Sequence, residues 1–113
     1  MTNYSAGHAA ELVAADFIGS QGFKIRELNW KTKYCEVDIV AEKDDRVYFV
    51  EVKYRRNDNQ GSGLDYITPN KLRQMAFAAE MWVSDHDWSG DYQLAAIELS
   101  DLPPRVTNFL TDL

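Results

Sequence analysis

Two carboxylates and a lysine in the middle of the chain have the types and spacing of a hydrolytic site. Asp38 and Glu51 lie on two runs of alternating apolar and polar residues, and a pair of aspartates at positions 44–45 separates the runs. This pattern predicts an antiparallel hairpin with a two-residue turn. Its register places Asp38 opposite Glu51 and Glu36 opposite Lys53, with opposed Cβ atoms roughly 5 Å apart. Carboxylates that face each other repel, and a divalent cation between them would remove that repulsion.

The bulk composition predicts one domain, residues 1–113, with a single core. Hydrophobic residues make up 45% of the chain and charged residues 27%, which is ordinary for a folded protein of this length. The apolar runs fall far short of the roughly 20 residues that span a bilayer, and the first residues show no export signal. Cys35 is the single cysteine and has no disulfide partner. We therefore expect a cytoplasmic protein without membrane contact.

The net charge argues against a protein that coats DNA non-specifically. Acidic residues outnumber basic ones and give −6 at pH 7, whereas binding to the DNA backbone depends on Lys and Arg. The bases are nevertheless clustered, at Lys31 and Lys33 and again at Lys53, Arg55 and Arg56. An acidic chain with basic patches is compatible with weak or transient contact to nucleic acid.

The expected elements are two helices and four strands. The first helix runs from about Ser5, its N-cap, to about Gln21, and Gly22 is the C-cap. The second begins with Thr68 as N-cap and Pro69 at its first position, and it stops near 84–87. The strands are expected at 23–30, in the two arms of the hairpin, and at 92–99.

Helical spacing identifies the faces that should be buried. The first helix has a stripe formed by Ala6, Ala9, Val13 and Phe17, widened by Ala10 and Leu12. The second has a stripe formed by Leu72, Met75, Ala76, Ala79 and Val83, with Phe77 and Met81 at its margin.

The remaining segments are expected to be irregular. Residues 57–63 are rich in turn formers and predict a flexible loop. Pro103 and Pro104 are expected to end the regular structure, so that the core is 5–100 and the segment 101–113 is a tail. Within that tail, residues 105–113 form a short helical turn or a frayed end.

The order helix, three strands, helix, strand predicts an α/β (α+β) fold. The first three strands form an antiparallel meander, and the last strand, apolar on both faces near its middle, is interior. A central mixed four-stranded sheet flanked by helices buries all the apolar stripes.

Four motifs in a fixed order carry a resemblance to a known family. They are Gly7-His-Ala-Ala-Glu11, Glu36-Val-Asp38-Ile-Val-Ala, Tyr48-Phe-Val-Glu51-Val-Lys53-Tyr-Arg55, and Gly63 through Thr68-Pro-Asn-Lys71 with Ala78-Ala79 beyond. Together they resemble the PD-(D/E)XK nuclease superfamily and, more narrowly, its YraN-type family of small restriction-endonuclease-like proteins. The resemblance spans roughly residues 5–100.

The resemblance implies a catalytic and metal-binding set. Asp38 and Glu51 would be the metal ligands, with the Val52 carbonyl as a further oxygen ligand and Glu11 bound directly or through water. Lys53 would lie beside the attacking water. Hard oxygen ligands of this kind suit Mg²⁺ or Mn²⁺, which lower the pKa of bound water and neutralise charge on a phosphate.

The resemblance also implies a substrate and partners. DNA is the expected substrate, cut in repair or recombination and in branched or single-stranded form, and Lys71, Arg55 and Lys33 are the candidate contacts to it. Many relatives in the superfamily act as dimers, so a homodimer is compatible with the resemblance.

Several candidates have a second interpretation that the sequence leaves open. Glu11 has the pattern of a solvated helix acid as well as that of a ligand. Glu36 either holds the Lys53 ammonium in place or forms a plain cross-strand salt bridge. His8 shares a helix face with Glu11, although a lone histidine is more often a capping or surface residue. The three tryptophans are more often core residues than base-stacking platforms.

Three functions are consistent with these residues. The first is a metal-dependent endonuclease. The second is a nuclease fold that binds nucleic acid or a protein partner without turnover. The third treats Glu51 and Lys53 as ordinary strand charges in an α/β domain.

Overall fold

A computed structural model describes the backbone of residues 3–56 and 66–113, and their side chains from Gly7 onward. The loop expected at 57–63 lies outside these ranges. The described elements are α1 (Asn3–Ser20), β1 (Lys24–Lys31), β2 (Glu36–Lys43), β3 (Arg46–Arg55), α2 (Pro69–Asp85), β4 (Asp91–Ser100) and β5 (Arg105–Leu110). None of the helices in the described part of the chain is both long and apolar enough to cross a membrane.

The described strands form one mixed sheet in the order β1-β2-β3-β4-β5. The first three strands are the expected antiparallel meander. α2 connects β3 to β4, which pairs with it in parallel. β4 is interior, as predicted, and its last six residues are all buried. The prediction of a four-stranded sheet was wrong, because β5 adds a fifth strand antiparallel to β4.

The segment expected to be a helical turn or frayed tail is the strand β5. Val106 and Phe109 from this strand pack against the core beneath α1. Their spacing is not the period of two that marks a strand, because the register shifts between Glu98 and Leu99 and leaves Thr107 out of the pairing. The bulge thus hides the strand from pattern analysis.

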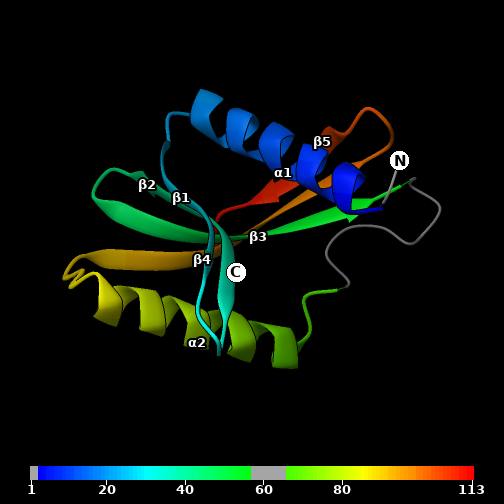
Figure 1. Ribbon diagram of the computed structural model, residues 1–113. Coiled ribbons are helices and arrows are strands. Elements are labelled where there is room, and N and C mark those ends of the chain that lie inside the picture. Colours follow the sequence, from blue (N-terminus) through cyan, green and yellow to red (C-terminus); the bar gives the residue numbers. More distant parts are fainter. Residues whose placement is uncertain (1–2, 57–65) are drawn as a thin grey trace.

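The two helices cover opposite faces of the sheet (Figure 1). α1 packs on one face through Ala10, Ala14 and Ile18, which are fully buried. Ala10 was part of the expected stripe, and its members Val13 and Phe17 pack against the same core. Ala14 and Ile18 were missed, and Leu12, which was assigned to the stripe, is exposed. α1 also begins at Asn3, so Ser5 lies inside the helix and is not its N-cap.

α2 packs on the other face of the sheet. Its start is as predicted, because the Thr68 hydroxyl accepts a hydrogen bond from the Lys71 amide and Pro69 occupies the first helical position. This kind of cap stabilises a helix by about 1 kcal/mol. Its buried residues are Met75, Ala78, Ala79 and Trp82. Ala78 and Trp82 therefore replace Ala76 and Val83 of the predicted stripe, since both of the latter are only half-buried.

Candidate active site

The β2–β3 hairpin has the predicted turn and register. Asp44 and Asp45 have φ angles of 53° and 64°, the left-handed values that a two-residue type I′ turn requires. Pairing then runs without a shift from Lys43–Arg46 to Ile39–Val50. This register brings Asp38 and Glu51 to the same end of the hairpin, one step beyond the last pair.

The carboxylate of Asp38 accepts a backbone hydrogen bond just beyond the last residue pair of β2 and β3. Its Oδ2 accepts a hydrogen bond from the Val52 amide at 2.8 Å, in place of the simple opposed pair that the sequence predicted. Glu36 does not pair with Lys53 across this hairpin. It pairs with Lys31 of β1, at 3.9 Å and with both side chains exposed, because β2 is hydrogen-bonded to β1 on that side.

Asp38 is the described acid whose electrostatic state departs most from normal. Its pKa is raised from 3.8 to about 7. Burial is the main cause, the Val52 amide opposes it, and the negative charges of Glu51, Glu11 and Glu36 raise the pKa further. Three acids therefore act on one partly buried carboxylate. Such a concentration of negative charge costs stability and suits a site for a cation.

Asp38 lies where two clefts meet. The larger, of about 500 Å³, is also lined by Glu36, Glu51 and Lys71. The smaller, of about 260 Å³, is lined by Asp38, Val52, and His8 and Glu11 of α1, among others. The two expected metal ligands thus share the larger cleft, whereas Glu11 approaches Asp38 from the other side. A ligand in either cleft can reach the Asp38 carboxylate.

Lys71 from α2 enters the larger cleft and binds a predicted metal ligand. Its Nζ lies 2.9 Å from Oε2 of Glu51. The sequence assigned Lys71 to substrate phosphate, and this position above Glu51 lets the same ammonium serve either an anion in the cleft or the carboxylate. Lys71 therefore neutralises one of the two acids that would hold a metal.

The donor set fits a divalent cation of the hard type. In the described part of the chain no group of three or more His, Cys, Asp and Glu side chains lies close enough to enclose a metal. Mg²⁺, however, is commonly held by one or two carboxylates, with waters and substrate phosphates completing its shell. Asp38 and Glu51, both on the wall of an open cleft, provide that number of carboxylates.

Lys53 lies beside an aromatic ring that the sequence analysis did not single out. Its Nζ is 5.6 Å from the centre of the Tyr66 ring, within the range of a cation–π contact. Burial is the main reason that the pKa of Tyr66 is raised, and the charge of Glu51 is the next cause. The ring therefore lies near both Lys53 and the Glu51 carboxylate. No pattern in the sequence places a tyrosine just before a helix next to these strands.

Arg55, a predicted contact to substrate, has a structural partner in the fold. The side chain is 10% exposed and its Nε lies 2.9 Å from Oε2 of Glu98, which is 7% exposed. The other carboxylate oxygen of Glu98 accepts a hydrogen bond from the Thr107 hydroxyl at 3.2 Å. Arg55 is thus half of a buried ion pair that joins β3 to β4. The signal for Glu98 in the sequence is weak, since it is only an acid within an apolar strand.

This ion pair predicts a large effect of Arg55 on stability. Arg55→Met should lower the free energy of unfolding by about 3 kcal/mol, because it leaves the Glu98 charge buried without its partner. Urea unfolding measures this, and Arg56→Met, at the exposed neighbour, is the matched control. The double variant Arg55→Met with Glu98→Leu should recover most of the loss. Equal stability of Arg55→Met and the wild type would contradict the assignment.

The remaining candidates occupy the rims of the two clefts. Lys33 is exposed, and its Nζ lies 5.2 Å from the centre of the Tyr34 ring at the border of the larger cleft. His8 and Glu11, one turn apart on α1, lie 3.8 Å from each other at the smaller cleft. The structure thus keeps Lys33 available to a ligand and pairs Glu11 with a histidine.

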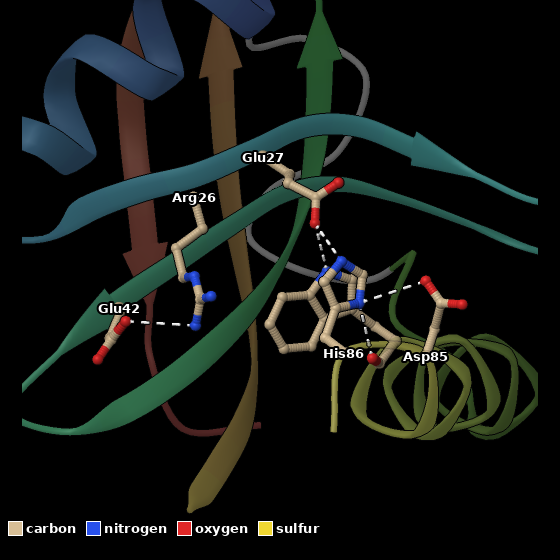
Figure 2. A network of polar contacts seen from close by, with 6 residues as sticks. Arg26, Glu27, Glu42, Asp85 and His86 are labelled. Carbon is tan, nitrogen blue, oxygen red and sulfur yellow. Dashed lines mark hydrogen bonds and ion pairs between the residues drawn. The ribbon is translucent and has the colours of Figure 1, made fainter. Parts of the chain in front are cut away.

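A second polar network lies away from these clefts, between β1 and the end of α2 (Figure 2). The Nε2 atom of His86 lies 2.7 Å from a carboxylate oxygen of Glu27, and the same oxygen accepts a hydrogen bond from the Trp82 indole. Trp82 is fully buried and stacks on His86. This network connects the edge strand β1 to the end of α2. The expectation that Trp82 is a core residue is confirmed.

Comparison with known proteins decides the family. The family model "Uncharacterised protein family UPF0102" matches residues 10–101. The chain belongs to the UPF0102 family. A UPF0102 protein of Vibrio parahaemolyticus is 33% identical over 97 residues, 84% of this chain and 80% of the relative. One from Syntrophomonas wolfei is 41% identical over 81 residues, 72% and 70% of the two chains.

Membership in UPF0102 confirms the resemblance to the YraN-type family. A third relative, from Pelobacter propionicus, is 38% identical over 104 residues, 88% of this chain and 74% of its own. The names of these relatives state the family and no activity. The region that matches UPF0102 includes Glu11, Asp38, Glu51 and Lys53, so the four candidate catalytic residues lie in the matched part of the chain, whereas His8 lies just before it.

Proposed function

We propose that this UPF0102 protein is a metal-dependent endonuclease of the PD-(D/E)XK type that hydrolyses phosphodiester bonds of DNA. The observation that supports it most is the position of Asp38, whose partly buried carboxylate shares a cleft with Glu51 and is also acted on by the charges of Glu11 and Glu36. Carboxylates with strongly perturbed pKa values cluster at functional sites. The restriction-endonuclease-like assignment rests on the order of the motifs around these residues.

The residues of the cleft have separate roles in this proposal. Asp38 and Glu51 would hold Mg²⁺ or Mn²⁺, with the Val52 carbonyl nearby. Bound there, the ion would supply an acidic water and a positive charge next to the phosphate. Lys53, on the same strand as Glu51, would donate hydrogen bonds that orient that water. Lys71, now 2.9 Å from Glu51, would be available to a substrate phosphate if an ion were held by that carboxylate.

A substrate panel tests the proposal. Purified protein with Mn²⁺ or Mg²⁺ is incubated with single-stranded, duplex, flap and four-way DNA, and the same reactions with EDTA are the control. We expect at least one substrate to be cut only when the metal is present. Failure to cut any member of the panel with either metal would contradict the proposal. A cytoplasmic location and action as a homodimer are further parts of it, to be tested by fractionation and light scattering.

The ion pair between Lys71 and Glu51 favours a second candidate function. Because this pair already neutralises one of the two acids, the cleft is also compatible with a module that binds nucleic acid or a protein partner without turnover. Binding of DNA that chelators do not affect, together with no cleavage, would identify this function. Loss of binding on chelation would count against it.

A further inference from the structure

Two exposed aromatic rings border the cleft that contains Asp38 and Glu51. Tyr34, in the turn between β1 and β2, is 68% exposed, and Phe77 on α2 is 47% exposed. Both line the cleft of about 500 Å³. Figure 1 shows the β1–β2 turn extending to α2. The two rings therefore come from two different walls of the cleft.

Packing does not account for these rings. Neither Tyr34 nor Phe77 belongs to the two core clusters of the described residues or to the partly buried residues packed against them. An exposed aromatic ring forgoes the free energy that burial would give it. Two such rings at one cleft form an apolar surface that is suited to a ligand with flat faces.

Each ring is accompanied by a cation. The Lys33 ammonium lies 5.2 Å from the centre of the Tyr34 ring. Arg73 precedes Phe77 by one turn of α2, so both point from the same face of the helix, and Arg73 lines the same cleft. Lys71 also lines the cleft, where it is paired with Glu51. The cleft therefore presents flat apolar faces next to groups that bind phosphate.

This combination is complementary to unpaired nucleotides. Proteins that bind single strands stack bases on aromatic rings and hold the phosphates with Lys and Arg. The bases of a duplex are already stacked on their neighbours, so their faces are closed to a protein ring. A cleft of this volume is also within the range of pockets for small ligands, which suits one or two nucleotides more than a double helix.

We propose that Tyr34 and Phe77 form a stacking site for unpaired bases, so that the substrate is a single strand or the single-stranded arm of a branched nucleic acid. This proposal rests on the proposed nuclease function, because the stacking site would hold the strand next to Asp38 and Glu51. It assigns a substrate class to the cleft and a role to two residues that the motifs of the family do not include.

Binding of a short labelled oligothymidylate and of a blunt duplex of equal length tests the stacking site. Fluorescence anisotropy is measured with Ca²⁺ in place of Mn²⁺. The wild type should bind the single strand at least about tenfold more tightly than the duplex. Tyr34→Ala and Phe77→Ala should each weaken binding of the single strand about tenfold, which corresponds to the stacking of one base.

Two further variants separate stacking from other effects. Tyr34→Phe retains a ring and should bind like the wild type, whereas Tyr34→Leu should bind like Tyr34→Ala. Tyr92→Ala removes a ring that is 42% exposed and lies at the far end of the sheet, paired with Val47, and it should have no effect. Equal affinity for duplex and single strand, or wild-type binding by the alanine variants, would overturn the proposal and favour a protein partner for these rings.

Cleavage assays on the same variants distinguish this proposal from the proposed function. If binding of the single strand depends on the two rings but nothing is cut, the stacking site stands and the nuclease function fails. If DNA is cut with a rate that is unchanged in Tyr34→Ala and Phe77→Ala, the nuclease function stands and the stacking site fails.

Discussion

Asp38→Asn is expected to lower the rate of metal-dependent DNA cleavage by about 10³-fold or more. The carboxylate is the acid that reaches both clefts, so its loss removes a charged ligand of the ion. An ion that polarises a phosphate contributes several kcal/mol to transition-state stabilisation, and each 1.36 kcal/mol corresponds to about a tenfold change in rate. Initial rates on the preferred DNA substrate measure the effect.

The substitution to asparagine is chosen because it leaves the local structure intact. The amide oxygen of asparagine can still accept the hydrogen bond that the Val52 amide donates to Asp38. Asp16→Asn, which removes an exposed acid from α1, changes the net charge equally and should cut DNA like the wild type. Cleavage by Asp38→Asn within tenfold of the wild-type rate would show that this carboxylate is not the centre of the site.

The same substitution is expected to stabilise the metal-free protein at pH 8. The pKa of Asp38 is about 7 in the fold, whereas the ordinary value for an aspartate in an unfolded chain is 3.8. Between about pH 4 and pH 7 the folded chain therefore retains a proton that the unfolded chain has lost, and above pH 7 the fold must hold an ionised carboxylate. The contribution of Asp38 to stability is therefore fully present below about pH 4 and is lost as the pH rises to about 7. A shift of this size corresponds to about 4 kcal/mol.

Urea unfolding of wild type and Asp38→Asn from pH 4 to pH 8 isolates the contribution of Asp38 to the free energy of unfolding. The asparagine does not titrate, so the variant should gain about 4 kcal/mol relative to the wild type over this range, and Asp16→Asn should show no such gain. Addition of Mn²⁺ at pH 8 should stabilise the wild type and leave the variant unchanged. If the variant is less stable than the wild type at pH 8, the ionised carboxylate stabilises the fold and this prediction is wrong.

Both predictions follow from one property of the cleft, which is that the ionised Asp38 carboxylate costs stability in the metal-free fold. Natural proteins tolerate such costs at functional sites. Arg55 shows the opposite case, since its charge is buried against Glu98 and holds two strands together.

Local chemistry explains which parts of the fold were predictable. The aspartate pair at 44–45 and the Thr68–Pro69 start of α2 act on neighbouring residues, so their signals are complete in the sequence. The turn alone sets the register that brings Asp38 and Glu51 together. These features were predicted correctly for that reason.

The features that were missed depend on contacts between distant segments. β5 contains a bulge beside Glu98, which breaks the alternation that identifies a strand. Arg55 would share the face of Glu51 by alternation, but an acid on the neighbouring strand binds it. Lys71 reaches Glu51 only because α2 crosses that face of the sheet. Periodicity carries no information about such pairs.

Calorimetric titration of Mn²⁺ into the protein at pH 8, where Asp38 is ionised, tests the central claim most directly. It needs no knowledge of the substrate, and Asp38→Asn and Asp16→Asn are titrated in parallel. We predict saturable binding to the wild type and to Asp16→Asn, and none to Asp38→Asn, because two carboxylates hold the ion. Binding of Mn²⁺ to Asp38→Asn with the affinity of the wild type would contradict a metal site at this cleft.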